Sequence, residues 1–158
     1  MVVYPGTFDP PHLGHLDIVS RAIDIFGEIT IAVSKRPRRE LLFSVEERVE
    51  MFKEMTQGLM GVAVVSFDGL LVDFLRSAGV KVILRGVRMF ADFEYELQIA
   101  LNNSRLGNAQ TIFMMPSQEF IHVSSSIVRD IASHCGTLKG YVHPFVERKL
   151  REKFNCGA

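Results

Sequence analysis

The segment that decides the fold is residues 4–15, which read YPGTFDPPHLGH. It follows a short apolar run at residues 1–4, which Pro5 and Gly6 bring to an end. Beyond it, apolar side chains recur at helical spacing, at Leu16, Val19, Ile23 and Phe26. Gly27 follows as a C-cap. A strand, a glycine- and proline-rich turn and a helix are the opening unit of an α/β sheet.

The same alternation continues to the end of the chain. Short apolar runs typical of strands lie at residues 29–33, 62–66, 80–84 and 111–115. Helical patterns lie at 44–55, 70–78, around 93–101, 124–132 and about 143–154. Runs that are apolar throughout are typical of strands buried on both faces. We therefore predict a single domain over residues 1–158 with a doubly wound, parallel, five-stranded, Rossmann-like α/β sheet.

Composition excludes several classes of function. The 158 residues carry no net charge, so no overall field attracts nucleic acid or an acidic membrane. No apolar stretch is long enough to span a bilayer, and the N-terminus does not resemble a signal peptide. Cys135 and Cys156 fit no zinc or redox motif. We expect free thiols and a cytoplasmic location.

Ligands of doubly wound sheets bind at the carboxyl ends of the strands, so the informative motifs directly follow strands. In the first turn, His12 and His15 are three residues apart at a helix start, a place suited to phosphate. Gly14 allows the backbone to approach a ligand. Histidines at this place can also simply cap the helix. Neither a Walker loop nor the dinucleotide fingerprint is present.

A second motif, RGVRMFADFEYELQ, follows the fourth expected strand at residues 85–98. Arg85 and Arg88 flank a glycine, and guanidinium groups suit phosphate. Their position after a strand favours a ligand over solvent. Glu96 has two open interpretations: a ligand of ribose or adenine, or a carboxylate on a helix surface.

A third motif, PSQEFIHVSSSIVR, follows the fifth expected strand at residues 116–129. Ser124, Ser125 and Ser126 open a helix, and a simple N-cap accounts for only one of them. We interpret them as a second phosphate cradle. Arg129, one turn into this helix, either points back at that cradle or pairs near Asp130.

The first and third motifs resemble the signatures of the nucleotidyltransferase superfamily, His-x-Gly-His and Ile-Ser-Ser-Thr/Ser-x-x-Arg. The second motif resembles a segment of bacterial phosphopantetheine adenylyltransferases, and the likeness covers essentially the whole chain. The resemblance implies in-line attack on the α-phosphate of ATP by 4′-phosphopantetheine, with dephospho-coenzyme A and pyrophosphate as products. It also implies Mg²⁺ bound mainly through the ATP phosphates, a homohexamer, and coenzyme A as feedback inhibitor.

The resemblance also assigns residues to roles. It makes His15, Thr7 and Arg88 catalytic, and it places 4′-phosphopantetheine against Thr7, Arg39, Leu71 and Arg85. It places ATP against Thr7, Phe8, His12, His15, Gly86, Val87, Arg88, Glu96, Phe120, Ile121, His122, Val123, Ser124, Ser125 and Ser126.

The sequence departs from the family at a few of these positions. Arg39 stands in the register of a lysine, and Lys35, Arg36 or Arg38 is an alternative contact for the acceptor. Phe120, His122 and His12 replace Trp, an aromatic residue and Thr.

Other functions remain open on the sequence alone. They are adenylyl transfer to nicotinamide mononucleotide, cytidylyl transfer, and nucleotide binding in a regulatory module without catalysis.

Overall fold

A computed structural model describes residues 1–37 and 39–157. Its five strands are β1 (Val2–Gly6), β2 (Ile29–Ser34), β3 (Val62–Phe67), β4 (Val82–Gly86) and β5 (Gln110–Met114). They form one sheet in the order β3-β2-β1-β4-β5, and every neighbouring pair is parallel. This confirms the predicted doubly wound parallel sheet. β1 lies at its centre, and the chain crosses to the other side after β3.

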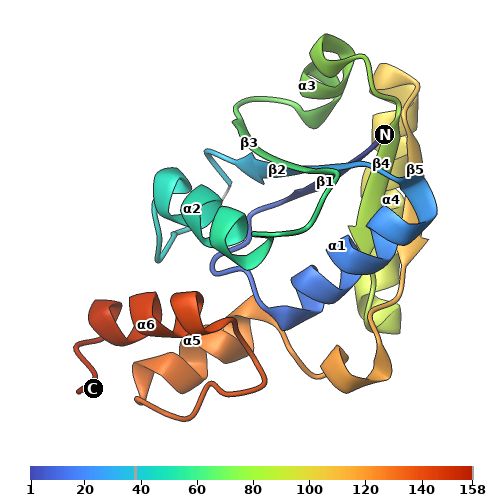
Figure 1. The fold of residues 1–158 in the computed structure, drawn as a ribbon. Coiled ribbons are helices and arrows are strands. Elements are labelled where there is room, and N and C mark those ends of the chain that lie inside the picture. The colour runs from blue at the N-terminus through green and yellow to red at the C-terminus, as the bar shows by residue number, and fades with distance from the viewer. Residues whose placement is uncertain (38, 158) are drawn as a thin grey trace.

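Helices follow the strands as the sequence pattern predicted (Figure 1). They are α1 (Leu13–Phe26), α2 (Val45–Met55), α3 (Leu71–Ala78), α4 (Phe90–Gly107), α5 (Ser125–Ser133) and α6 (Pro144–Lys153), with a 3₁₀ turn η1 at Gln118–Phe120. Gly27 and Gly79 cap α1 and α3, and Ser44 with Glu47 forms the expected capping box of α2. No helix in the described part of the chain could cross a membrane.

The first strand extends further than its sequence predicted. Pro5 and Gly6 do not stop β1 but pair with Ala32 and Val33 of β2. The only pair in register between β1 and β4 is Val3 with Ile83, before the proline. The missing N–H of Pro5 is therefore tolerated, and its carbonyl accepts from Arg85 Nη1 instead. β1 thus carries its end directly to the candidate site.

Three apolar clusters hold these elements together. Two of them pack helices against the faces of the sheet. The third joins α2, α5 and α6 and includes Phe43, Met51, Val128, Val146 and Leu150, which are almost completely buried. Figure 1 shows α5 and α6 side by side, away from the N-terminal end of β1. This cluster fixes the start of α5 beyond the carboxyl ends of the strands.

The expectation of free thiols is wrong. Cys135 and Cys156 form a disulfide. Each cysteine lies two or three residues beyond the end of a helix, Cys135 after α5 and Cys156 after α6, and these two helices pack against each other. Motif spacing could not reveal the pair because their 21-residue separation closes only when the helices pack.

Candidate active site

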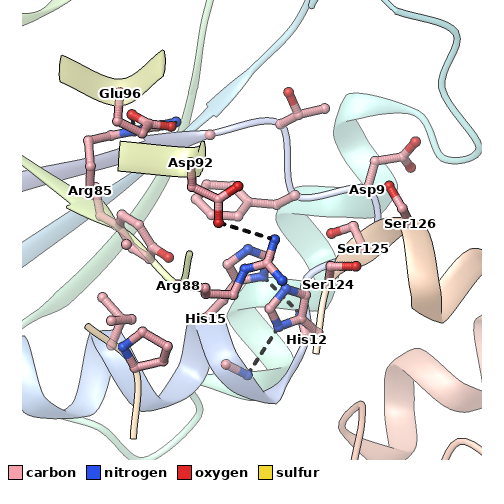
Figure 2. Close-up of a pocket in the computed structure, with 18 of the residues that line it drawn as sticks. Asp9, His12, His15, Arg85, Arg88, Asp92, Glu96, Ser124, Ser125 and Ser126 are labelled. Carbon is pink, nitrogen blue, oxygen red and sulfur yellow. Dashed lines mark hydrogen bonds and ion pairs between the residues drawn. The ribbon is translucent and has the colours of Figure 1, made fainter. Parts of the chain in front are cut away.

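A cavity of about 500 Å³ lies at the carboxyl ends of β1 and β4 and the starts of α1, α4 and α5. It gathers residues from all three sequence motifs (Figure 2). Those predicted residues that line it are Thr7, Phe8, His12, His15, Arg39, Arg85, Gly86, Arg88, Glu96, Ser124, Ser125 and Ser126. In Figure 2 the Arg85–Glu96 pair and the serines lie on opposite sides, with the histidines and Arg88 between them.

The turn after β1 is held by an aromatic side chain. Phe8 has a positive φ of 52° and folds its ring back over Gly6. A Cβ on Gly6 would lie 2.7 Å from that ring, so only glycine fits. The ring also packs edge-on against His15 and Phe52, with centroids 4.9 and 4.6 Å apart. Thr7 is thereby fixed between strand and helix.

Hydrogen bonds from the backbone set the tautomer of both histidines. The His12 amide donates to His15 Nδ1 at 3.0 Å, and the Gly14 amide donates to His12 Nδ1 at 3.1 Å. Each Nδ1 is therefore an acceptor, and the proton of a neutral ring resides on Nε2. The rings stack with centroids 3.6 Å apart. The turn thus presents two Nε2–H donors side by side.

The same geometry explains Gly14 differently from the sequence prediction. A Cβ at Gly14 would meet the His12 ring at 2.9 Å. The space above this glycine is taken by imidazole, so the glycine permits the stacked histidines, and it also lines the cavity.

Both histidines are neutral at physiological pH. Burial, followed by the charge of Arg88, lowers the pKa of His12 to about 3. Burial, followed by the charges of His12 and of Arg88, lowers the pKa of His15 well below its usual value. Cation formation here would place two charges in contact beside an arginine. In the absence of a bound anion, the pair therefore offers two neutral hydrogen-bond donors.

Arg85 and Glu96 form a bidentate ion pair. Arg85 Nε and Nη2 donate to the two carboxylate oxygens at 2.7 and 2.6 Å. Burial alone would lower the pKa of Arg85, but the hydrogen bonds and charge of Glu96 raise it. Glu96 is the buried residue of α4, so its interpretation as a surface carboxylate is wrong. Its carboxylate fixes the guanidinium at the edge of the cavity.

Arg88 lies at the centre of the site. Its Nη1 donates to the Val123 carbonyl at 3.2 Å, and its Nη2 lies 3.7 Å from Asp92 (Figure 2). Both contacts are long, and the side chain is about one-third exposed. Arg88 is therefore free to turn toward an anion in the cavity.

The serines bind mainly the protein itself. Ser124 Oγ accepts from the Ile127 amide as an N-cap, and Ser125 Oγ donates to the Pro10 carbonyl. Arg129 Nη1 donates to the Asp9 carbonyl, so this side chain points back at the cavity, as one of the two interpretations expected. The anion donors at this end are thus the free amides of α5, Arg129, and the hydroxyls of Ser124 and Ser126, which only accept hydrogen bonds from the described residues.

The basic loop after β2 sends one described arginine into the cavity. Arg39 lines it, whereas Arg36 turns away to pair with Asp68 at 2.8 Å. The alternative Arg38 lies outside the described residues. Of the described candidates Lys35, Arg36 and Arg39, Arg39 is the one that lines the cavity.

Several predicted residues do not line the cavity. They are Leu71, Val87, Phe120, Ile121, His122 and Val123. Leu71 packs against one of the two clusters on the sheet, and Phe120 packs against the third cluster, which joins α2, α5 and α6. His122 lies edge-on to Tyr141. Their predicted roles in substrate binding stay predictions.

Sequence reasoning missed a group of polar side chains that shape the cavity. Asp9 is buried and accepts from the amides of Leu42 and Phe43. Asp17 accepts from the amide and hydroxyl of Ser117 and so ties α1 to the segment after β5. Asp17 lies one turn beyond the histidines, but no residue near it in the sequence indicates its partner 100 residues away.

The described residues contain no group of three or more metal-ligating side chains that could hold an ion. Carboxylates near the cavity are already engaged. Asp9 binds two amides, Glu96 binds Arg85, and Asp92 accepts from the Met89 amide. A divalent cation at this site would depend on ligands from a bound phosphate and from water.

Comparison with known proteins identifies the family of the chain. Residues 3–131 match the family model described as cytidylyltransferase-like. The chain is 63% identical to the phosphopantetheine adenylyltransferase of Aquifex aeolicus (strain VF5) over 99% of its length and 98% of the relative. It is 51% identical to that of Symbiobacterium thermophilum over 96% and 94%, and 43% identical to that of Thermotoga neapolitana over 99% and 98%.

The parallel sheet, with its stacked histidines and the starts of α1 and α5 at the cavity, together with the family match, defines a nucleotidyltransferase of the cytidylyltransferase-like class. Within that class, the sequence identity to phosphopantetheine adenylyltransferases over nearly the full length decides the family. The chain belongs to the phosphopantetheine adenylyltransferase family.

Proposed function

We propose that the chain transfers AMP from ATP to 4′-phosphopantetheine in the cavity at the ends of β1 and β4. A phosphate oxygen of the acceptor attacks the α-phosphorus of ATP. The bond from that phosphorus to the bridging oxygen of the β-phosphate breaks, and pyrophosphate leaves. The observation that carries the proposal is the pair of Nε2–H donors, because donors fixed beside a reacting phosphate stabilise its transition state.

Positive and neutral donors are arranged to suit two polyanions. The α5 amides and Arg129 bind the β- and γ-phosphates, His12, His15 and Arg88 face the α-phosphate, and Arg39 and Arg85 hold the acceptor phosphate. Holding both reactants in line removes roughly 7–11 kcal/mol of the barrier. The acceptor phosphate is already ionised near neutral pH, so the attack requires no general base.

Mg²⁺ accompanies ATP and is held mainly by its phosphates and by water, since the nearby carboxylates are engaged. It supplies charge neutralisation on the triphosphate. We expect the enzyme to work in the cytoplasm, where its Cys135–Cys156 disulfide departs from the reduced thiols usual there. Coenzyme A carries the same pantetheine and adenine parts as the product, and its binding in the same cavity accounts for feedback inhibition.

The chain assembles into a homohexamer through α4. Large apolar side chains remain exposed along this helix, among them Phe90, Leu97 and Leu101. A stripe of this kind on a described helix supports an interface between copies of the chain.

Pyrophosphate release tests the reaction. The protein is given ATP with 4′-phosphopantetheine and, separately, ATP with nicotinamide mononucleotide. We expect pyrophosphate release when ATP is combined with 4′-phosphopantetheine, and none when it is combined with nicotinamide mononucleotide. Pyrophosphate release only with nicotinamide mononucleotide would reassign the acceptor. Binding of ATP without pyrophosphate release in either reaction would favour a regulatory module.

A variant of the catalytic histidine completes the test. His15→Ala should lower kcat by about 10²–10³ while the Kd for ATP changes only slightly, because the Nε2–H donor acts on developing charge. His134→Ala is the matched control, since His134 is exposed and contacts only Ser133 and Asp130. Equal losses in both variants would contradict the role of His15.

A further inference from the structure

Arg48 is a fully buried arginine that does not line the cavity. It lies in the first half of α2, on the face that carries Phe52 and Met55 into the interior. Burial lowers the pKa of its guanidinium, and the charge of Asp9 opposes that effect. Its Nη2 has no hydrogen-bond partner among the described residues. Burying a charged guanidinium costs free energy of folding, so its presence in the interior implies that its hydrogen bonds have a specific role.

Its partners are four backbone carbonyls. Nη1 donates to Thr7 at 2.7 Å and to Ser34 at 2.9 Å, and Nε donates to Phe43 at 3.1 Å and to Ser44 at 3.2 Å. They lie just after β1, at the last residue of β2, and at the start of α2, where the segment that follows β2 ends.

The position of Nη1 follows from the register of the sheet. Gly6 and Val33 are the last residues paired between β1 and β2. Thr7 and Ser34 come next, and Ser34 is the last residue of β2, where it pairs with Phe67 of β3. Nη1 joins their two carbonyls and so continues the connection between the strands by one residue through a side chain.

Nε closes the loop at its other end. Residues 35–43 leave β2 at Ser34 and return to α2 at Phe43 and Ser44, and Arg48 holds both ends. Asp9 adds bonds to the Leu42 and Phe43 amides. Arg39, which lines the cavity, lies inside this loop. One guanidinium therefore sets the position of Thr7 relative to Arg39.

We propose that Arg48 is a positioning residue for the acceptor, which fixes Thr7 and the Arg39 loop at the spacing that 4′-phosphopantetheine requires. This inference rests on the proposed function. In the proposed function, ATP also contacts the N-terminal ends of α1 and α5, which Arg48 does not touch. Replacing Arg48 should therefore weaken binding of the acceptor more than binding of ATP. Lysine keeps the charge but cannot span four carbonyls as the planar guanidinium does.

The test compares Arg48→Lys with the wild type in steady-state turnover, with ATP binding measured by calorimetry. We expect the KM for 4′-phosphopantetheine to rise about 10- to 100-fold, while the Kd for ATP changes less than about threefold. Thr56→Val is the matched control. It removes a buried hydrogen bond at the far end of the same helix and should leave both constants unchanged.

A double variant tests whether Arg48 acts through the loop. The effects of Arg39→Ala and Arg48→Lys on the acceptor KM should be less than additive, because both disturb one contact. Full additivity, equal losses for both substrates, an unchanged KM, or failure of Arg48→Lys to fold would each overturn the proposal. Absence of wild-type turnover would instead count against the proposed function.

Discussion

His12 and His15 couple the site to folding through pH. Their pKa values are lowered in the folded chain, so below about pH 6.5 the unfolded chain takes up protons that the folded chain does not. Stability is then fully present above pH 6.5 and falls as the pH decreases toward the folded pKa, about 3 for His12. Each histidine contributes a slope of about 1.4 kcal/mol per pH unit.

His12→Thr should remove one of these slopes, because threonine still caps a helix but does not titrate. Urea unfolding of the variant and the wild type between pH 4.5 and 7.5 measures the difference. Carboxylates contribute to both proteins alike and cancel. Parallel curves for the two proteins would show that His12 titrates normally in the folded state.

The pair of Arg85 and Glu96 has a different energetic signature. Arg85→Met leaves a buried carboxylate without its cation, which should cost about 3–5 kcal/mol in the free energy of unfolding. Arg85→Met combined with Glu96→Leu removes both charges and should recover most of that loss. Denaturant unfolding of both variants measures these changes in the free energy of unfolding. A double variant no more stable than the single one would mean that packing, and not charge, dominates this contact.

The disulfide acts at the scale of helices, since it joins the ends of α5 and α6. Closing a loop of 21 residues should stabilise the fold by about 3 kcal/mol, chiefly by restricting the unfolded chain. Cys135→Ser with Cys156→Ser should show that loss in thermal or urea unfolding, with kcat little changed. A reductant should have the same effect on the wild type and none on the variant. A variant as stable as the wild type would rule out a structural role for the bond.

The strands and helices could be predicted because each depends on its own sequence. β2 is rich in β-branched and apolar residues since both of its faces are covered, and the capping box at Ser44 is a local signal. The edge of the sheet at which ligands bind could also be predicted, because the carboxyl ends of parallel strands lie at one edge. Partners far apart in the chain could not be predicted. Nothing near Arg85, Arg48 or Cys135 indicates that each closes on a residue of another element.

At the scale of the whole molecule, α4 is a helix whose apolar side chains remain largely exposed. Only Glu96 of its 18 residues is buried, although the helix also carries Phe90, Leu97 and Leu101. Leu101 is 63% exposed, and Ile112 on the neighbouring edge strand β5 is 37% exposed. Apolar side chains at helical spacing normally face a core, so the missing partner of this face is best supplied by another copy of the chain.

Leu101→Glu should therefore break the assembly without unfolding the chain, because it places a charge in the apolar stripe and disturbs no contact with the sheet. Light scattering and sedimentation should show a hexamer for the wild type and a smaller species for the variant. Met60→Glu makes the same chemical change at a side chain that is 88% exposed and far from α4 in the sequence, and it should remain hexameric. A monomeric wild type would contradict the homohexamer outright. A hexameric Leu101→Glu variant would keep the assembly but move its interface away from α4.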